Sequence, residues 1–550
     1  MRSVKTLALG AGFAFVTLAM FVQGVLPSVV PEARSTRVTR AVRTDLGEIK
    51  WVRAESRDYS ERERAGRAVY IREGCWYCHS QYVRPVAGEE LRWGPVAEAG
   101  EYAYDLPHLL ATRRIGPDLS RVGGKYSDDW HYAHYWNPRL SVPDSIMPRF
   151  PWLFAQVRVP VQAIADGLAL PWIPALAPYF TGREGAPIRI FPNADGVAFV
   201  PPAGDGGWPL DGRPVLDTTP FKGRPPALAT VLLVLPTRET VGLVRYVQKL
   251  GMNRGAWREV FEPQNVGVGA MTIPAGEDLR ARGEAVYGQR CAGCHGRDGD
   301  GNGPAATFLS PRPRDFTAGV FKFRTTPSGS LPTDGDLFRT LTRGVRWTAM
   351  PTWHELADKD RLAVVSFIKT FSPRWKAERP EPPLAIAGPP TPTPELIARG
   401  RTLYAAAKCF ECHGDLGKGD GPSAAQLKDD FDLPIRPTDL SRGQFKGGSQ
   451  VTDVFRATTL GLDGTPMPSF ADTMTDEERW AISYFVLSLS AWADPATGER
   501  LPLPAGARAT LNGGDVTAAH PRSAWDPLAP PGVAGVGPGK PRRYYPGIAE

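Results

Sequence analysis

The sequence predicts a mainly α-helical protein: one N-terminal transmembrane helix, then three small all-α domains, with an irregular Pro/Gly-rich insert and tail. Three observations lead to this prediction. The chain has one long apolar segment, a Cys-x-x-Cys-His motif that occurs three times, and a pair of amphipathic segments around each motif. A length of 550 residues also exceeds one ordinary core and agrees with several domains.

Composition limits the function classes. The net charge is +7 and the pI is near 9.0, but charges of both signs are interleaved and there is no long basic block. We therefore expect no nucleic-acid partner. The 58 glycines and 55 prolines exceed average usage, which favours small, loop-rich domains joined by prolyl linkers.

The apolar segment is residues 6–30, "TLALGAGFAFVTLAMFVQGVLPSVV", which has 25 residues and no charge. About 20 apolar residues span a bilayer. We predict an uncleaved anchor in the lipid bilayer, because a signal peptide has a shorter apolar core and a clearer cleavage site. Four arginines follow the segment, so the positive-inside count opposes export of the body. The side of the membrane on which the rest of the chain lies must therefore be inferred from the cofactor chemistry of that part.

All six cysteines belong to the three motifs, each of which ends in a histidine. They are Cys75, Cys78 and His79; Cys291, Cys294 and His295; and Cys409, Cys412 and His413. A zinc site needs further close ligands, but the pairs lie more than a hundred residues apart. A redox dithiol has no use for the histidine. Cys-x-x-Cys-His is the attachment motif of c-type haem, so we predict three covalently bound haem c.

Each motif follows a short amphipathic helix in which a glycine precedes a tyrosine by four residues. The pairs are Gly66 and Tyr70, Gly283 and Tyr287, and Gly400 and Tyr404. Such a glycine suits a close helix crossing. A second helix is predicted to end each domain, in "ETVGLVRYVQKLG", "DKDRLAVVSFIKTF" and "DEERWAISYFVLSL". This is the plan of a small cytochrome c.

A second axial iron ligand is predicted from three methionines that stand directly before proline. They are Met147, Met350 and Met467, each between a haem motif and a terminal helix. A thioether opposite histidine raises the haem potential. The remaining histidines, among them His131 and His134, share no position, so a surface or hydrogen-bonded role is predicted for them.

The predicted layout follows from the motifs. It is a membrane anchor at 1–35; a haem 1 domain at 36–262 with an insert at about 154–236; a haem 2 domain at 263–380; a haem 3 domain at 381–495; and a Pro/Gly-rich tail at 496–550. Domains two and three are siblings that share G-P-x-A-A, P-x-D and F-K. The insert is either a partner-facing subdomain or a largely irregular surface loop.

The first domain carries a family resemblance. Its text from "EGCWYCHSQYVRP" through "RRIGPDLSRVGGKYSDDWHYAHYWNPRLSVPDSIMPRFPWL" resembles the monohaem subunit (subunit II) of cbb-type haem-copper cytochrome c oxidases. The likeness is dense from about Gly66 to Leu153 and resumes in the terminal helix. It implies that the carbonyl of Pro117 orients His79. The insert and the two added domains depart from the family, whose subunit normally carries one haem, whereas the added domains resemble general class I cytochrome c modules.

The resemblance implies a membrane-anchored triheme electron-transfer subunit with no catalytic centre of its own. It would relay electrons to a haem-copper oxidase core subunit in the membrane, where oxygen is reduced. The donor would be a cytochrome c, a cupredoxin or a quinol-oxidising complex. Covalent haem c implies the bacterial inner (cytoplasmic) membrane, with the haem domains on its periplasmic or outer side. Two alternatives stay open: the cytochrome c subunit of a nitric oxide reductase, or a free-standing anchored carrier.

Overall fold

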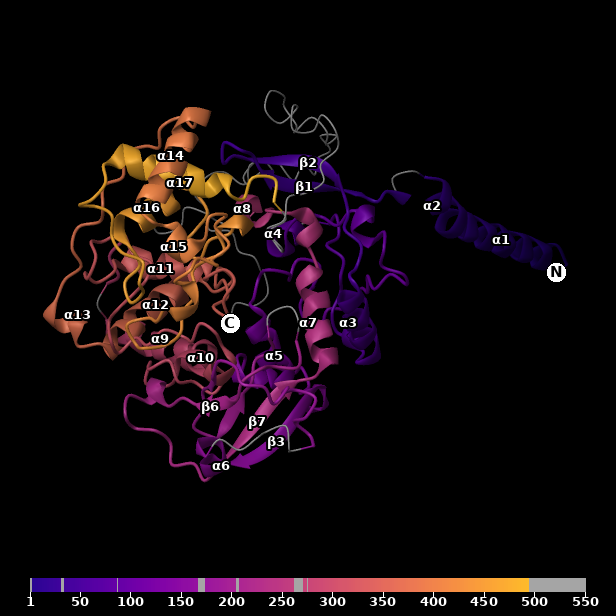
Figure 1. Cartoon of the computed structure of the whole chain (residues 1–550). Coiled ribbons are helices and arrows are strands. Elements are labelled where there is room, and N and C mark those ends of the chain that lie inside the picture. Colours follow the sequence, from indigo (N-terminus) through magenta and orange to yellow (C-terminus); the bar gives the residue numbers. More distant parts are fainter. Residues whose placement is uncertain are drawn as a thin grey trace.

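The structure is a computed structural model, which describes residues 2–30, 34–86, 88–166, 174–203, 207–261, 271–274 and 276–493. Figure 1 shows an isolated N-terminal helix, three helical units and a small β region at one end of the body. The mainly helical prediction is confirmed. The predicted tail at 496–550 lies outside the described residues.

The N-terminal segment projects away from the body (Figure 1). It comprises α1 (Arg2–Met20), a short π-helical stretch (Phe21–Val25) and α2 (Leu26–Val29). Within the described part of the chain, one helix, Val4–Val25, is long and apolar enough to cross a membrane, and it buries none of its surface against the body. An apolar helix that packs against no protein surface is suited to a lipid environment.

The first helical unit begins with a β-hairpin that the sequence patterns did not predict. Strands β1 (Arg37–Arg43) and β2 (Ile49–Glu55) pair antiparallel, with Arg40 opposite Val52. The helices of this unit are α3 (Glu61–Arg72), α4 (Glu89–Trp93), α5 (Asp128–Trp136), α7 (Arg238–Lys249) and α8 (Arg258–Phe261). Ser60 begins α3 with a capping box to Glu63, which satisfies the first free amides of the helix.

The second and third units repeat one helical plan. The second unit comprises α9 (Glu277–Arg290), α10 (Ala292–His295), α11 (Asp334–Arg343), α12 (Asp358–Ile368) and α13 (Arg374–Ala377). The third unit comprises α14 (Pro394–Ala406), α15 (Phe410–His413), α16 (Val451–Leu460) and α17 (Asp476–Ser488). Thr333 at the start of α11 and Thr475 at the start of α17 form capping boxes. The residues at each helix start therefore determine where the helix begins.

In each unit the helix before the haem motif crosses the terminal helix at a glycine. A Cβ atom on Gly66 would lie 1.8 Å from the carbonyl oxygen of Gly242, and one on Gly283 or Gly400 would lie 2.0 Å from a carbonyl oxygen of α12 or α17. Only a hydrogen fits there, as the sequence predicted. One turn later a tyrosine meets an aromatic ring of the terminal helix. These pairs are Tyr70–Tyr246 (centroids 5.2 Å apart), Tyr287–Phe367 (5.3 Å) and Tyr404–Phe485 (5.2 Å).

Of the two predicted alternatives for the insert, a subdomain or a largely irregular loop, the structure shows a folded β region. Its elements are β3 (Phe154–Pro160), α6 (Val161–Ala165), β4 (Ile188–Ile190), β5 (Val197–Phe199), β6 (Pro214–Leu216) and β7 (Thr230–Pro236). The sheet has the order β3-β7-β5, with β3 antiparallel and β5 parallel to β7, and β4 pairs with β6. A separate core with Leu176, Ile190 and Leu233 supports it. The apolar run "TVLLVLP" was a usable strand signal within the Pro/Gly-rich text.

The insert is also attached to the second unit. The Thr307 hydroxyl donates to the carbonyl oxygen of Phe191, and it accepts a hydrogen bond from the amide of Phe199 at 3.3 Å. The side-chain amide of Asn302 donates to the carbonyl oxygen of Pro220 at 3.0 Å. These contacts hold the loop that follows the second haem motif.

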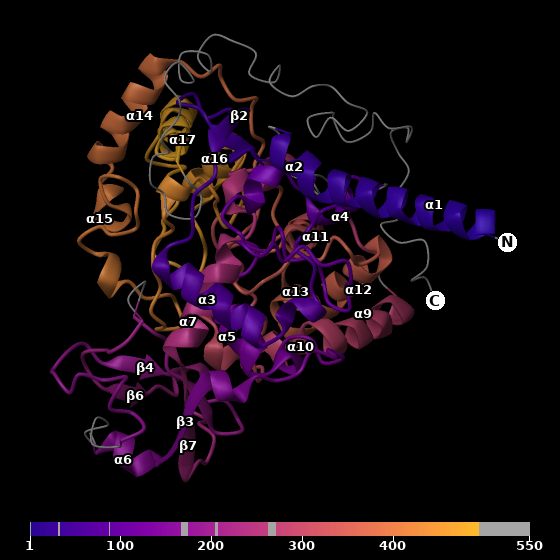
Figure 2. The ribbon, with the colours of Figure 1, turned by 90° about the vertical axis from the view of Figure 1, so that its right-hand side faces the viewer.

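The hairpin and the third unit meet at the opposite end of the body from the insert (Figure 2). The side chain of Trp492 is 1% exposed, and its indole donates to Asp45 at 2.9 Å. The Arg43 guanidinium donates to the carbonyl oxygen of Gly443 at 3.3 Å. The residues nearest the anchor are thus joined to the residues furthest along the described chain.

Candidate haem-binding sites

The three Cys-x-x-Cys-His motifs adopt one local conformation. In each, the histidine amide donates to the carbonyl oxygen of the first cysteine, at 3.0 Å in the first motif and 2.9 Å in the second and third. Both cysteines and the histidine therefore share one helical turn directly after the crossing helix. All six cysteines are unbridged and half-buried.

The environment of the thiols argues against zinc or a redox dithiol. Burial raises the pKa of Cys75, Cys291 and Cys294 to about 12 and that of Cys409 to about 11, so these thiols are protonated at neutral pH. Disulfide exchange needs a thiolate, whereas a metal ion deprotonates the thiol that it binds, so these pKa values argue only against a redox dithiol. Among the described residues, no group of three or more His, Cys, Asp or Glu side chains is placed to hold a metal ion.

Each motif histidine is oriented by a backbone carbonyl. His79 Nδ1 lies 2.8 Å from the carbonyl oxygen of Pro117, as the family resemblance implied. His295 Nδ1 lies 3.0 Å from that of Arg314, and His413 Nδ1 lies 3.4 Å from that of Thr438. A carbonyl oxygen only accepts, so Nδ1 carries the proton and the Nε2 lone pair is left for a metal. Burial lowers the pKa of all three imidazoles, to about 4 for His295, which keeps them neutral.

The orienting carbonyls belong to a turn that the sequence reasoning missed. In each unit the residue after the orienting carbonyl is an aspartate. Its carboxylate accepts a hydrogen bond from the backbone amide two residues after the aspartate. The distances are 2.8 Å for Asp118 and Ser120, 2.8 Å for Asp315 and Thr317, and 3.0 Å for Asp439 and Ser441. Such Asx turns are a local property of Asp and of the residues that follow it. The signal was an Asp-x-Ser/Thr triplet after each haem motif, although the same triplet also occurs elsewhere, as at Asp58 and Asp463.

The three methionines also share a local conformation. The methionine amide donates to a hydroxyl two residues earlier, at 3.3 Å from Ser145 to Met147, 3.1 Å from Thr348 to Met350, and 3.2 Å from Thr465 to Met467. All three side chains are half-buried. The full repeat is thus Ser/Thr-x-Met-Pro, which is more specific than the Met-Pro pair.

Core packing brings cysteine and methionine together in two units. Cys75 and Met147 pack against one core cluster, and Cys291 and Met350 pack against another. The corresponding cluster of the third unit includes Cys409 and Met474. Met467 is held instead through its carbonyl oxygen, which accepts from the Leu462 amide at 3.1 Å.

Two further histidines lie on α5 near the first motif, and the predicted surface role is wrong for His131. His131 is 2% exposed, and His131 Nε2 and His134 Nδ1 are buried without a hydrogen-bond partner among the described residues. Burial, and then the neighbouring His131 and His79, lower the pKa of His134 to about 3. The His134 ring stacks on Trp130, with centroids 4.4 Å apart. Chain spacing gave no sign of this cluster.

These residues fit haem c. Each unit offers two thiols, an imidazole with a free Nε2 and a thioether, which is the donor set of haem c, and in the first two units a thiol and the thioether pack around one core. The unpaired nitrogen of His134 next to His79 agrees with a polar group that the protein alone does not supply.

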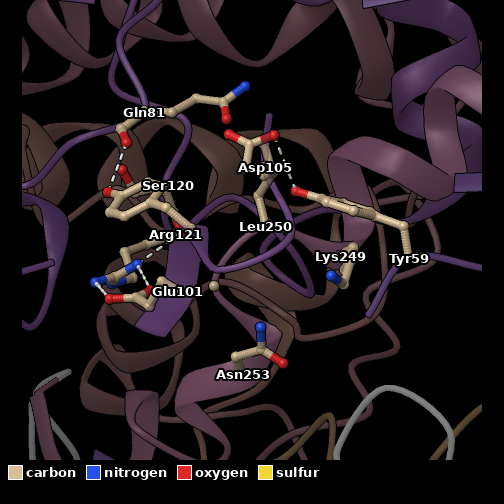
Figure 3. Close-up of a pocket in the computed structure, with 11 residues that line it drawn as sticks. Tyr59, Gln81, Glu101, Asp105, Ser120, Arg121, Lys249, Leu250 and Asn253 are labelled. Atoms are coloured by element: carbon tan, nitrogen blue, oxygen red, sulfur yellow. Dashed lines mark hydrogen bonds and ion pairs between the residues drawn. The ribbon is translucent and has the colours of Figure 1, made fainter. Parts of the chain in front are cut away.

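A small polar cavity lies in the first unit behind the His79 loop. Its volume is about 30 Å³, enough for one water molecule, and it is lined by Tyr59, Asp105, Lys249 and their neighbours (Figure 3). The Tyr102 hydroxyl donates to the carbonyl oxygen of Gln81 at 2.7 Å. This cavity is far too small for a haem. Its lining residues hold the loop after His79 through the hydrogen bond between Tyr102 and Gln81.

Comparison with known proteins agrees with this description. Residues 14–170 match the family "Cytochrome C oxidase, mono-heme subunit/FixO", residues 278–368 match "Cytochrome C oxidase, cbb3-type, subunit III", and residues 397–490 match "Cytochrome c". No curated protein matches. Among solved structures, a chain of the reducing HAO-like protein complex Kustc0457/Kustc0458 from Kuenenia stuttgartiensis is 45% identical. The match covers 40% of this chain and 99% of that one, with a TM-score of 0.38.

The family matches follow the three helical units in order. The first extends from the anchor into the insert, and the other two each enclose one Cys-x-x-Cys-His motif. Cytochrome c domains bind haem c covalently, and the FixO family is an electron-transfer component of cbb3-type oxidases. The chain therefore joins, in one polypeptide, a region of the FixO type, which is the mono-heme subunit of cbb3-type oxidases, to two cytochrome c domains.

Proposed function

We propose that the chain binds three haem c and relays single electrons to the haem-copper core of a cbb3-type oxidase. The observation that carries the proposal is the threefold repetition of one site. Each unit pairs a histidine whose Nδ1 faces a carbonyl oxygen with a Ser/Thr-x-Met-Pro loop. A repeat at this level of detail supports three equivalent cofactors rather than one.

In this proposal the residues of the three sites have distinct roles. The cysteine pairs 75 and 78, 291 and 294, and 409 and 412 attach the haems, and His79, His295 and His413 are the proximal ligands. Met147, Met350 and Met467 would supply a thioether to the iron, which raises the potential. When bound, haem c supplies the one-electron chemistry. The protein orients each imidazole through Nδ1 and packs an aromatic pair at the helix crossing beside each motif.

Contacts between units support electron transfer along the chain. Gly293, inside the second haem motif, packs so closely on the first unit that a Cβ atom there would lie 2.1 Å from the carbonyl oxygen of Leu140. Cys294 packs against the core cluster of the first unit. The second site is thus adjacent to the FixO-type unit. We place the exit to the oxidase core at that unit, and the entry of electrons at the other two.

The anchor and the haem chemistry support a location in the bacterial inner membrane, with the haem units on the periplasmic or outer side. The N-terminal helix would hold the first unit near the bilayer, because only the hairpin separates them. An oxidase core subunit is the proposed acceptor, and a cytochrome c, a cupredoxin or a quinol-oxidising complex is the proposed donor.

Two measurements test the proposal. A pyridine haemochrome assay on the purified chain should give three covalent haems, and the double variant Cys291→Ala/Cys294→Ala should give two. Purification from native membranes should then recover haem b, copper and oxygen consumption with the chain. A count other than three contradicts the haem assignment. Nitric oxide consumption, or no haem-copper partner, contradicts the oxidase role.

A further inference from the structure

The methionine loops of the second and third units carry a charged residue at the same position. It stands four residues before the methionine, as Arg346 before Met350 and as Asp463 before Met467. Each loop is closed by an equivalent backbone hydrogen bond, which the methionine carbonyl oxygen accepts at 3.0 Å in the second unit and 3.1 Å in the third. The two charged residues therefore occupy equivalent places in one loop conformation.

Both charged residues pair with a side chain of opposite charge in the preceding unit. Arg346 Nη1 lies 3.0 Å from Oε1 of Glu259, on α8 of the first unit. Asp463 Oδ1 lies 2.7 Å from Nη2 of Arg324 in the second unit, and Asp463 also accepts from the Ser328 hydroxyl at 2.9 Å. The Glu259 and Arg324 side chains are 0% exposed. Solvent ions screen such shielded pairs much less than surface pairs, so each pair fixes its loop against the neighbouring unit.

The backbone of each loop is bonded to the same neighbour. The Ser127 amide of the first unit donates to the carbonyl oxygen of Thr348 at 3.2 Å. The Arg324 guanidinium of the second unit donates to the carbonyl oxygen of Leu460 at 3.0 Å, where the loop of the third unit begins. Each methionine loop is thus held by the preceding unit through a side chain and through its backbone.

The next residue of each loop also packs on the preceding unit, and its backbone is left-handed. The φ angle is 56° at Trp347 and 74° at Gly464. The Trp347 ring lies 3.4 Å from the Cβ position of Gly124 in the first unit, and the Arg314 guanidinium of the second unit lies 3.1 Å from the Cβ position of Gly464. A bulky residue seldom adopts a positive φ, so tertiary packing must hold Trp347 there.

The methionine loop of the first unit is built differently. Pro143 stands four residues before Met147 and carries no charge. Pro143 and the following Asp144 are both exposed. The Ser/Thr-x-Met-Pro loop therefore does not need a charged residue at this position. The charge accompanies the two loops that lie against a preceding haem-motif unit.

We propose that Arg346 and Asp463 are positioning residues that make sulfur ligation of a haem depend on the docking of its unit to the preceding unit. The inference rests on the proposed binding of haem c with methionine as a ligand. Each ion pair restrains a loop that lies between helices, and so keeps the thioether within reach of the iron. The two pairs have opposite polarity, so an exchange of neighbours would place like charges against each other. The charges therefore also fix the order in which the units dock.

The test uses the full chain purified in detergent, with the ferric absorbance spectrum and a spectroelectrochemical titration as readouts. Sulfur ligation gives ferric haem c a weak charge-transfer band at long wavelength. Asp463→Asn, and Arg324→Gln in the preceding unit, should each remove the part of this band that one haem contributes and lower one midpoint potential, because a thioether raises it. Asp472→Asn, at an exposed carboxylate of the third unit, should change neither readout.

The sign of the shift separates positioning from a direct effect of charge. Asp463→Asn removes a negative charge and Arg324→Gln removes a positive one. A purely electrostatic effect would raise the potential in the first variant and lower it in the second, whereas loss of the sulfur ligand lowers it in both. Opposite shifts with an intact charge-transfer band would overturn the inference.

A double variant assigns the effect to the third haem. Met467→His already lacks the sulfur of that site, so adding Asp463→Asn should remove no further band intensity. Adding Arg346→Gln to Met467→His should still remove the contribution of the second haem. If Asp463→Asn removed as much intensity with Met467→His as without it, the effect would fall on another haem and the positioning role would be refuted.

Ser328→Ala is the mildest test, because the residue is exposed and the change removes a single hydrogen bond to Asp463. It should shift the same potential downward, by less than Asp463→Asn does. Three haems with an unchanged band and unchanged potentials in both variants also refute the positioning role. A haem count below three, or no sulfur band, in the unsubstituted chain contradicts the proposed function instead.

Discussion

His295 Nδ1 lies 3.0 Å from the carbonyl oxygen of Arg314, while the guanidinium of the same arginine reaches the methionine loop of the next unit. One residue thus orients the imidazole of one site and contacts another site. The backbone contact is reproduced by Pro117 and Thr438 in the other units, but only Arg314 among the three has a charged side chain. Arg314 therefore links the second candidate site to the methionine loop of the third unit.

The methionine assignment is tested most sharply in the third unit. Met467→His should lower the midpoint potential of one haem and leave the other two unchanged, because imidazole does not stabilise ferrous iron as a thioether does. Spectroelectrochemical titration measures this. Met474→Leu is the matched control, since Met474 packs against the core of the same unit and should not affect any potential. Three unchanged potentials in Met467→His would remove Met467 from the ligand set.

The helix crossing of the second unit should not tolerate a methyl group. A Cβ atom on Gly283 would lie 2.0 Å from the carbonyl oxygen of Ala363, so Gly283→Ala must separate α9 from α12, at a cost of about 1–3 kcal/mol or more. Gly288→Ala on the same helix is the control. Its Cβ meets nothing within 4 Å, and the substitution should stabilise the helix by about 1 kcal/mol. Chemical denaturation followed at the haem absorbance compares them, and equal midpoints would refute the crossing.

The attachment of the insert should depend on Thr307. Thr307→Val removes the hydroxyl that bonds Phe191 and Phe199, leaving buried backbone groups unpaired at a cost of about 1–3 kcal/mol. Hydrogen exchange of the amides in 188–199 should rise, with little change in the helices of the third unit. Thr402→Val, at an exposed position on α14, should leave this exchange unchanged. If the amides in 188–199 exchanged no faster in Thr307→Val, contacts other than the Thr307 hydroxyl would be holding the insert.

Asp129 should make the contact between the first two units sensitive to pH. Burial, then the neighbouring Asp128, raise the pKa of this carboxyl from 3.8 to about 7, although the Ser310 amide donates to it at 3.2 Å. The folded state therefore favours the protonated form. This stabilisation is present in full below pH 3.8 and is lost as the pH rises through about 7.

Asp129→Asn, which resembles the protonated form, should match the unsubstituted chain at pH 4 and exceed its stability at pH 8. Urea unfolding followed by tryptophan fluorescence across this range measures the difference. Asp472→Asn, at an exposed site, should give no such pH-dependent gain. A constant difference between Asp129→Asn and the unsubstituted chain at both pH values would contradict the assignment.

Sequence reasoning succeeded where the signal is local. The haem motifs, the glycine before each tyrosine and the Met-Pro loops all lie within a few residues, and their conformations depend mainly on those residues. The capping boxes and the Asp-x-Ser/Thr turns are equally local. They could have been predicted from the sequence, but they were recognised only in the structure. The strands β3 and β7 were overlooked because glycine and proline around them suggested irregular structure.

The sequence by itself predicted the anchor, the three candidate sites and their donor chemistry, because the signal for each lies within one short segment. Only the tertiary structure decided which segments meet: the hairpin with Trp492, Thr307 with the insert, His134 with His79, and Lys322 with Lys446. Contacts between distant segments depend on how whole surfaces pack and on which charged side chains those surfaces bring together. Neither can be read from spacing along the chain.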